Sequence, residues 1–310
     1  MLKNARILVT GGAGFIGSHL VDRLSSENEV IVLDNLASGS LANLEQSKDH
    51  ITLIKGDILD KPMIESIVAD VEFIFHLAAN VGNIKSIEDP YFDMEVNIKG
   101  TLNLLEACLN SNVRKFVYSS SAAIYGDAIY LPIDESHPLN PESPYAVSKL
   151  AAEKYCFAFH KVHGIPTIAL RYFNVYGPRQ GSSQYANVIP IFFRRIRDKE
   201  PLTIFGDGNQ TRDFINVKDV VAANILAAET EEVLGIFNIA SSKSTSVNEL
   251  ADYVIDITNY QTKRIYAPPR KGEVLHSLAD ISASKRSLGF SPSMNIADGL
   301  RQYFEYLKAH

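Results

Sequence analysis

Residues 6–24 read RILVTGGAGFIGSHLVDRL, and this stretch decides the fold. A short apolar run leads directly into a glycine-rich turn, and an amphipathic pattern follows the turn. Glycines at this spacing allow a tight turn, close approach of a pyrophosphate and close packing of helix on strand. The unpaired N–H groups at the start of the helix then face the phosphates. We therefore predict a dinucleotide site formed by Gly11, Gly14, Phe15, Ile16 and Gly17.

An acidic residue at the end of the second apolar run supports this prediction. Asp34 follows the run 29–33, where a carboxylate accepts hydrogen bonds from the adenosine ribose hydroxyls. A carboxylate there repels a 2′-phosphate, and the next residues, Asn35 and Leu36, provide no arginine to bind one. The sequence thus favours NAD over NADP. Asn35, beside Asp34, is expected to contact the cofactor as well. After the third run, Asp57 and Ile58 either contact the adenine or belong to a solvated turn.

Short apolar runs alternate with helical patterns through the first half of the chain. The runs are 6–10, 29–33, 51–54, 73–77, 115–118 and 167–170, and helical patterns such as 16–24 and 100–109 lie between them. This alternation is typical of a doubly wound parallel sheet covered on both faces. Beyond about residue 174 the pattern loosens. We predict an α/β fold with a Rossmann-type NAD-binding domain over residues 1–173 plus about 213–242. A smaller interleaved domain takes about 174–212 and 243–310.

The composition excludes several classes of protein. At 310 residues, 46% hydrophobic and 21% charged, the chain is long enough to bury a sizeable core, which excludes a disordered protein. Its net charge of −6 gives no general footprint for nucleic acid. Two cysteines cannot make a disulfide framework, and neither a signal peptide nor a run of about 20 apolar residues is present. We expect a cytoplasmic protein with no nucleic-acid or membrane partner.

Two segments carry the predicted chemistry. The segment SSSAAIYG, residues 119–126, follows a strand at the edge where open α/β sheets bind ligands. The segment PYAVSKL, residues 144–150, begins a helix and places Tyr145 and Lys149 on one face. An ammonium beside a phenol is expected to lower the phenol pKa from about 10 toward working pH, as a general base requires. Ser121 is the candidate hydrogen-bond partner of the same oxygen. The spacing of Tyr145 and Lys149 alone is most often that of a solvated helix face.

These motifs together resemble the extended short-chain dehydrogenases/reductases, specifically the NAD-dependent sugar-nucleotide epimerase/dehydratase family, over essentially the whole chain. The resemblance implies that Ser121, Tyr145 and Lys149 are catalytic, that Ser121 and Tyr145 contact the substrate, and that Tyr145 and Lys149 also contact NAD. The segment HLAA, residues 76–79, matches a motif beside the cofactor, which adds Leu77, Ala78 and Ala79 to the NAD site. Asn97 matches the helix asparagine of the family.

The resemblance also implies a nucleotide-sugar site. Asn174, in the segment RYFNVYGPR, matches an asparagine that contacts the substrate diphosphate. Two further segments, 187–190 and 204–208, resemble those that hold uracil and ribose, and they contain Asn187, Val188 and Phe205. Arg212 and Arg270 match arginines that clamp the diphosphate, as a guanidinium fork does, and Glu273 matches an acidic residue at the ribose. Singly, each arginine would more often be a surface residue.

The two residues directly after the catalytic hydroxyl residue narrow the reaction. Related 4,6-dehydratases carry an Asp-Glu pair there and related decarboxylases usually a Glu, whereas this chain has Ala122 and Ala123. The catalytic cysteine of the fucose-synthase branch is also missing. The remaining set suffices for 4-epimerisation of a UDP-sugar, in which Tyr145 takes the C4 hydroxyl proton, hydride passes to NAD⁺, and the 4-keto sugar turns over before hydride returns. No metal is needed.

Substrate choice depends on one small residue. Ser277 aligns with a position that gates space around the sugar C2 group, and its size leaves room for an acetamido group. We therefore expect interconversion of UDP-N-acetylglucosamine and UDP-N-acetylgalactosamine, together with UDP-glucose and UDP-galactose. If Ser277 is merely a small loop residue, a UDP-glucose-only enzyme is the alternative. A UDP-glucuronate 4-epimerase would need a cation such as Arg179 or Lys85 at the C6 carboxylate, and a non-catalytic NAD-binding member is the remaining alternative.

The resemblance further implies a homodimer. Family members usually pair through two helices of each subunit, here expected at 100–109 and 145–160.

Overall fold

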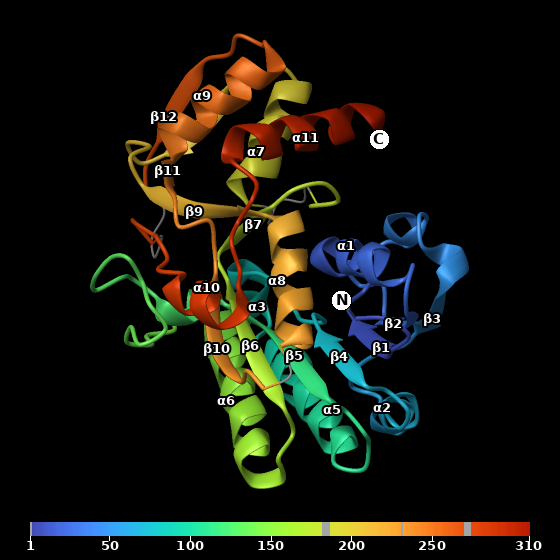
Figure 1. The fold of residues 1–310 in the computed structure, drawn as a ribbon. Helices are drawn as coiled ribbons and strands as arrows, with labels where there is room; N and C mark the ends of the chain where they lie inside the picture. Colours follow the sequence, from blue (N-terminus) through green and yellow to red (C-terminus); the bar gives the residue numbers. More distant parts are fainter. Residues whose placement is uncertain (1, 182–186, 231, 270–273) are drawn as a thin grey trace.

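The protein is described from a computed structural model of the 310-residue chain. The described residues are 2–181, 187–230, 232–269 and 274–310. Two regions stand apart in the ribbon, a sheet with helices around it and a smaller assembly beyond one end of that sheet (Figure 1). Within the described ranges, no helix combines the length and the apolar character that a membrane span requires.

The larger region is built on a parallel sheet of seven strands in the order β10-β6-β5-β4-β1-β2-β3, which confirms the predicted fold class. The strand order changes direction between β1 and β4, and ligands of open α/β sheets bind outside the strand ends at such a switch point. The strands are β1 Arg6–Thr10, β2 Glu29–Asp34, β3 Ile51–Lys55, β4 Phe73–His76, β5 Lys115–Ser121, β6 Thr167–Tyr172 and β10 Gly235–Ile239.

Both faces of this sheet are covered because its strands are apolar on both sides. On one face, α1 (Phe15–Leu24), α8 (Val217–Glu229) and α10 (Ser282–Leu288) pack over residues such as Val9 and Phe75. On the other, α2 (Lys61–Val68), α5 (Gly100–Cys108) and α6 (Pro144–His163) pack over residues such as Leu8 and Ile74. Neighbouring strand residues thus enter opposite cores, as the pleat requires.

Short helical segments connect these elements. Residues after β4 form α3 (Asn83–Glu88), α4 (Pro90–Met94) and a π-helical turn, Glu95–Lys99, that runs into α5. Further short 3-10 turns occupy Leu41–Leu44, Lys48–His50 and Ala122–Tyr125.

The smaller region has its own sheets and core. A three-stranded sheet contains β11 (Ser244–Ser246), β9 (Thr211–Asn216) and β7 (Asn174–Tyr176), and β8 (Leu202–Phe205) pairs with β12 (Arg264–Ala267). Three helices, α7 (Val188–Arg197), α9 (Val247–Thr258) and α11 (Ile296–Ala309), pack around a core that includes Phe192, Leu250 and Leu300.

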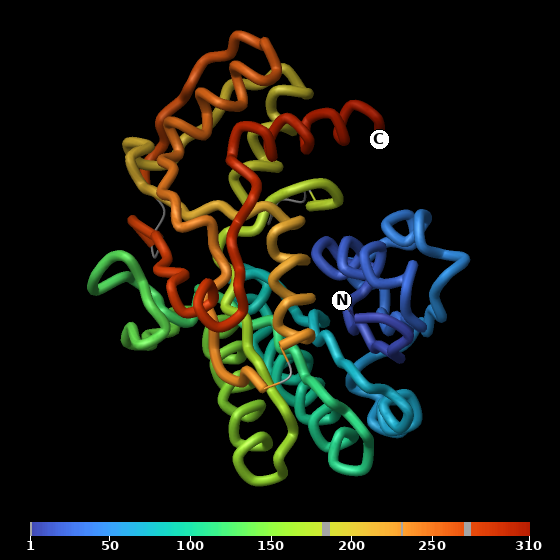
Figure 2. The backbone as a smooth tube through the Cα atoms, in the orientation of Figure 1, coloured from blue at the N-terminus to red at the C-terminus, as the bar shows by residue number. Residues whose placement is uncertain are grey.

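The chain passes between the two regions more than once, as the tube shows (Figure 2). After β9 it returns through α8 and β10 to the central sheet, and then leaves again into β11. The smaller region is therefore interleaved with the sheet in sequence. The residue limits of two separate domains stay a prediction.

Candidate active site

The glycine-rich turn lies between β1 and α1 and requires glycine at two positions. Gly11 has a φ of +70°, and its N–H donates to the Leu33 carbonyl at 2.8 Å. A Cβ on Gly17 would lie 2.2 Å from the Gly11 carbonyl oxygen, so no larger residue fits without a shift. Gly14 precedes α1 and provides no side-chain cap. The first N–H groups of α1 are thus left for an external acceptor, which fits a pyrophosphate.

Asp34 is held firmly at the end of β2. One carboxylate oxygen accepts from the Ala13 N–H at 2.9 Å and the other from the Leu36 N–H at 2.8 Å. The residue is 8% exposed, and each of its oxygens keeps a further lone pair for a ribose hydroxyl. This geometry fits the predicted contact with NAD.

The neighbouring adenine candidates occupy different environments. Asn35 is exposed and donates to the Asp57 carboxylate at 2.8 Å, while Asp57 also accepts from the Leu59 N–H. The Ile58 side chain is 5% exposed and packs beneath Gly100. Asp57 therefore lies in a bonded turn, and its contact with adenine stays a prediction.

The loop after β4 lies beside the glycine-rich turn at the switch point. Leu77 donates from its N–H to the Thr10 carbonyl at 3.1 Å, and the Ala78 N–H lies 3.3 Å from the Thr10 hydroxyl. A Cβ on Gly11 would approach the Ala78 nitrogen to 2.7 Å. Residues 77–79 and the glycine-rich turn therefore meet where the strand order reverses, as their predicted roles require.

Ser121, Tyr145 and Lys149 come from two elements that pack together. Ser121 ends β5, three residues later than the sequence pattern indicated, and its Oγ accepts from the Ala123 N–H at 3.2 Å. Tyr145 lies in the first turn of α6, where Ser143 caps the helix. Ser121 forms a side-chain hydrogen bond with Tyr145. The Lys149 ammonium lies 4.4 Å from the centroid of the Tyr118 ring. The structure thus brings the predicted residues to one edge of the sheet.

The pKa expected for Tyr145 was wrong in direction. Burial raises the pKa of Tyr145 to about 12, although the hydrogen bond from Ser121 lowers it. Burial also lowers the pKa of Lys149 to about 8. Desolvation disfavours both charged forms, and the ammonium lies over the Tyr118 ring. Burial therefore outweighs the Ser121 hydrogen bond, and the Tyr145 pKa lies above its usual value where the sequence predicted a lower one.

The predicted diphosphate and gate residues meet around β9. Asn174 begins β7, which pairs with β9, and its amide lies 3.4 Å from the Asp213 carbonyl. The Ser277 N–H donates to the Thr211 carbonyl at 3.1 Å, so the segment 275–277 lies along β9. Arg212 donates to the Leu275 carbonyl at 3.3 Å from the same strand. Ser277 is 7% exposed.

The remaining predicted substrate residues are less closely connected. Asn187 precedes α7 and is exposed, and Val188 is its first helical residue. Phe205 ends β8 in the two-stranded sheet. Arg270 and Glu273 lie outside the described residues.

Two acidic residues beside the site were missed by the sequence reasoning. Glu153 continues the four-residue spacing of Tyr145 and Lys149 along α6, a signal that was present in the sequence. It is fully buried and binds Arg171 at 2.7 and 3.0 Å, as well as the Ser120 hydroxyl at 2.6 Å. Asp93 is also fully buried, but no motif or spacing in its segment gave a signal.

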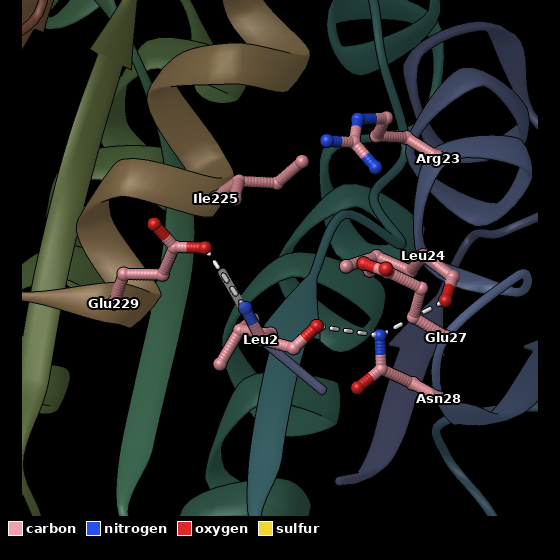
Figure 3. Close-up of a pocket in the computed structure, with 7 residues that line it drawn as sticks. All are labelled: Leu2, Arg23, Leu24, Glu27, Asn28, Ile225 and Glu229. Carbon is pink, nitrogen blue, oxygen red and sulfur yellow. Dashed lines mark hydrogen bonds between the residues drawn. The ribbon is translucent and has the colours of Figure 1, made fainter. Parts of the chain in front are cut away.

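A small cavity lies far from this site, near the start of β1 (Figure 3). It is lined from α1, α8 and the residues around Asn28, and its volume is about 10 Å³. The Leu2 N–H donates to Glu229 there at 2.8 Å, and Asn28 donates to the Leu2 carbonyl. Such a space holds about one water molecule, so the cavity is too small for a cofactor or a sugar.

Comparison with known proteins places the chain among enzymes that act on nucleotide sugars. The model of the NAD dependent epimerase/dehydratase family matches residues 7–240. A putative UDP-glucose 4-epimerase of Methanocaldococcus jannaschii is 42% identical over 305 residues, which cover 97% of this chain and 98% of the relative.

Two solved structures are similar over nearly the whole chain. A UDP-N-acetylglucosamine 4-epimerase from Methanobrevibacter ruminantium M1, in complex with UDP-N-acetylmuramic acid, has a TM-score of 0.96 and 40% identity over 99% of each chain. A UDP-glucose 4-epimerase from Thermotoga maritima, with UDP-glucose, has a TM-score of 0.93 and 40% identity over 98% of this chain and 99% of its own. This chain therefore belongs to the NAD-dependent epimerase/dehydratase family, and NAD is its cofactor.

Proposed function

We propose that the protein is a 4-epimerase of UDP-sugars that interconverts UDP-N-acetylglucosamine and UDP-N-acetylgalactosamine, and also UDP-glucose and UDP-galactose. The observation that carries this proposal is that Ser121, Tyr145 and Lys149 lie at the carboxyl edge of the sheet. In the sequence, Ser121 is directly followed by two alanines. Ala122 and Ala123 cannot transfer a proton, so they offer nothing for the loss of water from the sugar.

NAD is held, in this proposal, by the glycine-rich turn, the first turn of α1, Asp34 and the loop 77–79. The backbone N–H groups bind the pyrophosphate, and Asp34 accepts from the ribose. Bound NAD supplies the hydride acceptor and donor, as well as a positively charged ring in its oxidised form. Tyr145, whose pKa burial raises, would ionise more readily beside such a positive charge, because a nearby cation favours the phenolate.

The chain's own residues then move one proton. Tyr145 takes the proton from the C4 hydroxyl and later returns it to the C4 oxygen on the opposite face of the sugar. Ser121 donates a hydrogen bond to the reacting oxygen and orients it. Lys149, charged and nearly buried, stabilises the phenolate and binds the nicotinamide ribose. Because the proton returns to the product, the cycle releases none.

The N-acetylated substrate is favoured by the size and place of Ser277. This buried residue lies on the segment that pairs with the start of β9, beside the strand that carries Arg212. A small side chain there leaves space for the C2 acetamido group as the keto sugar turns. The similar 4-epimerase from Methanobrevibacter ruminantium was solved with an N-acetylated UDP-sugar, which supports the same choice.

A UDP-glucuronate 4-epimerase is the weaker alternative. It needs a cation at the C6 carboxylate, and Arg179 was one candidate. The Arg179 guanidinium lies 2.7 Å from Asp22 of α1, so its charge is already matched on the NAD-binding side. This pairing counts against Arg179 as that cation, and Lys85 on α3 stays the other candidate.

A substrate panel tests the proposal. Purified NAD-loaded protein is incubated separately with UDP-N-acetylglucosamine, UDP-glucose and UDP-glucuronate, and the products are identified by NMR. We expect the C4 epimers of the first two and no conversion of the third. If neither neutral sugar is converted, the 4-epimerase proposal fails; if only UDP-glucose is converted, the role of Ser277 fails.

We further propose a homodimer that pairs through α6. Exposed apolar residues cluster on α6 and the two short helices packed beside it, namely Ile84, Ile87, Tyr91, Met94, Val147 and Tyr155. Such patches are typical of interfaces. Most of α5 is instead buried within its own chain, so it contributes less than the sequence suggested. Sedimentation of the wild type and of Tyr91→Lys tests this: a dimer that the substitution separates is expected, and a monomeric wild type would contradict it.

A further inference from the structure

Asp93 on α4 is a buried carboxylate whose hydrogen-bond donors are all neutral. It has no exposed surface. One oxygen accepts from the Ser148 hydroxyl at 2.5 Å, and the other accepts from the amides of Asn80 and Asn97 at 3.2 Å each. We call these four residues the Asp93 cluster. Burying a carboxylate without a cationic partner is costly, so this arrangement calls for a compensating charge nearby.

The Asp93 cluster joins three parts of the candidate active site. Ser148 lies between Tyr145 and Lys149 on α6, and its hydroxyl is 3.0 Å from the Tyr145 carbonyl. Asn97, on the π-helical turn, donates to the Ser148 hydroxyl at 2.9 Å. Asn80, which follows the loop at the NAD side, donates its N–H to the Asn97 side chain at 2.8 Å. A single carboxylate thus links the first turn of α6 to both neighbouring segments.

The cation whose charge acts on Asp93 is Lys149. Among the described residues, the Lys149 ammonium has no hydrogen bond or ion pair, although the residue is only 3% exposed. The other nearby carboxylate, Glu153, is already matched by Arg171 in a two-point ion pair. Asp93 is therefore the carboxylate near Lys149 whose charge no guanidinium or other ammonium offsets.

The pKa directions agree with this geometry. Burial raises the pKa of Asp93, and Lys149 opposes that shift; burial lowers the pKa of Lys149 and raises that of Tyr145, and the charge of Asp93 raises both. The other titratable groups around Lys149 and Tyr145 are Glu153 and Cys156 on α6, Tyr118 on β5 and His76 on β4. Burial keeps Cys156 and Tyr118 uncharged and lowers the pKa of His76 to about 3, so these three residues supply no charge at neutral pH.

We propose that Asp93 is a positioning residue for the epimerase reaction: its buried carboxylate fixes the first turn of α6 through Ser148 and offsets the buried charge of Lys149. This inference rests on the proposed function, in which Tyr145 and Lys149 are catalytic. It assigns Asp93 no contact with substrate or NAD.

The pH dependence follows from the sign of the charge. Activity requires Tyr145 deprotonated and Lys149 protonated. It therefore rises with pH as Tyr145 loses its proton and falls with pH as Lys149 loses its proton. Removing a negative charge favours the deprotonated form of both groups. Both limbs of the pH profile of kcat therefore move to lower pH when Asp93 becomes uncharged. We expect the loss of this one charge from a buried site to move each limb by about one pH unit.

Asp93→Asn removes the charge while keeping the shape, and Asp219→Asn is the matched control. Asp219 is also a buried carboxylate, 3% exposed, that accepts three hydrogen bonds, but it lies at the start of α8 against residues 293–294. For each NAD-loaded variant we measure kcat and KM across pH, and the Tm. The ionisation of Tyr145 is followed by tyrosinate absorbance, and the absorbance of the Tyr145→Phe protein is subtracted as the blank. Asp93→Ser provides a second uncharged variant.

For Asp93→Asn we expect kcat to fall about tenfold, as for the loss of one charge-assisted hydrogen bond, with KM for the UDP-sugar unchanged. Both limbs and the Tyr145 ionisation should move to lower pH. Asp219→Asn should lower only the Tm. Unmoved limbs in an active Asp93→Asn protein would overturn the inference, as would failure of both Asp93 variants to fold, because Asp93 would then be a structural residue. An inactive wild type would instead overturn the proposed function.

Discussion

The two ends of the candidate active site are built differently. At the NAD end, the predicted contacts come from backbone N–H groups in one continuous stretch and from Asp34 about twenty residues later. At the catalytic and sugar end, the predicted contacts come from side chains on β5, α6, β7 and β9, and from the segment 274–279. The first end is local in sequence and depends on glycine, whereas the second depends on long-range packing. Substitutions at the catalytic and sugar end should therefore change turnover or substrate binding, whereas substitutions at the NAD end should change stability and NAD binding.

The largest expected effect is at the catalytic end. Tyr145→Phe removes the phenol oxygen that takes the C4 proton, while its ring still fills the same space. We expect kcat to fall by at least about a thousandfold, within the range of general acid–base catalysis. The protein should stay folded and NAD-loaded, measured as bound NAD released on denaturation. Retained turnover would refute the base assignment.

Gly17→Ala is the corresponding substitution at the NAD end. Its Cβ would lie 2.2 Å from the Gly11 oxygen, so the turn or α1 must move. We expect the free energy of unfolding to fall by about 3 kcal/mol, measured by thermal denaturation. We also expect the bound NAD to be lost, measured as NAD released when the protein is denatured. Gly181→Ala is the control, because a Cβ there meets no atom of the described residues within 4 Å and its φ is not positive. An NAD-loaded Gly17→Ala protein of normal Tm would break the contrast between the two ends.

The same contrast explains how far the sequence could predict the structure. The glycine-rich turn, Asp34 and the alternating apolar runs all act through local geometry, so the sheet and the NAD end followed from the pattern. The link between Asp93 and Ser148 spans 55 residues, and the placement of Ser277 along β9 spans 66. Neither has a local signal. The pKa of Tyr145 was misjudged because helical spacing says nothing about burial.

Enlarging the predicted gate is expected to have a smaller and selective effect. In Ser277→Tyr, the added ring would occupy space beside β9 that the acetamido group needs. We expect kcat/KM for UDP-N-acetylglucosamine to fall about a hundredfold and that for UDP-glucose to change little, measured in parallel assays. Ser277→Ala stays small and should keep both activities. Equal loss on both sugars would count against the gate.

The smallest expected effect concerns the diphosphate contact. Arg212 lies on β9 and is proposed to bind phosphate oxygens, so Arg212→Gln removes a charge that acts on bound substrate in both the ground and transition states. We expect KM for both UDP-sugars to rise about tenfold, with kcat and bound NAD unchanged. Arg197→Gln, at an exposed arginine of α7, is the matched control and should leave KM unchanged. If Arg212→Gln instead lost NAD, the two ends would not be separate, because a substitution at the sugar end would have disturbed the local backbone site that holds the cofactor.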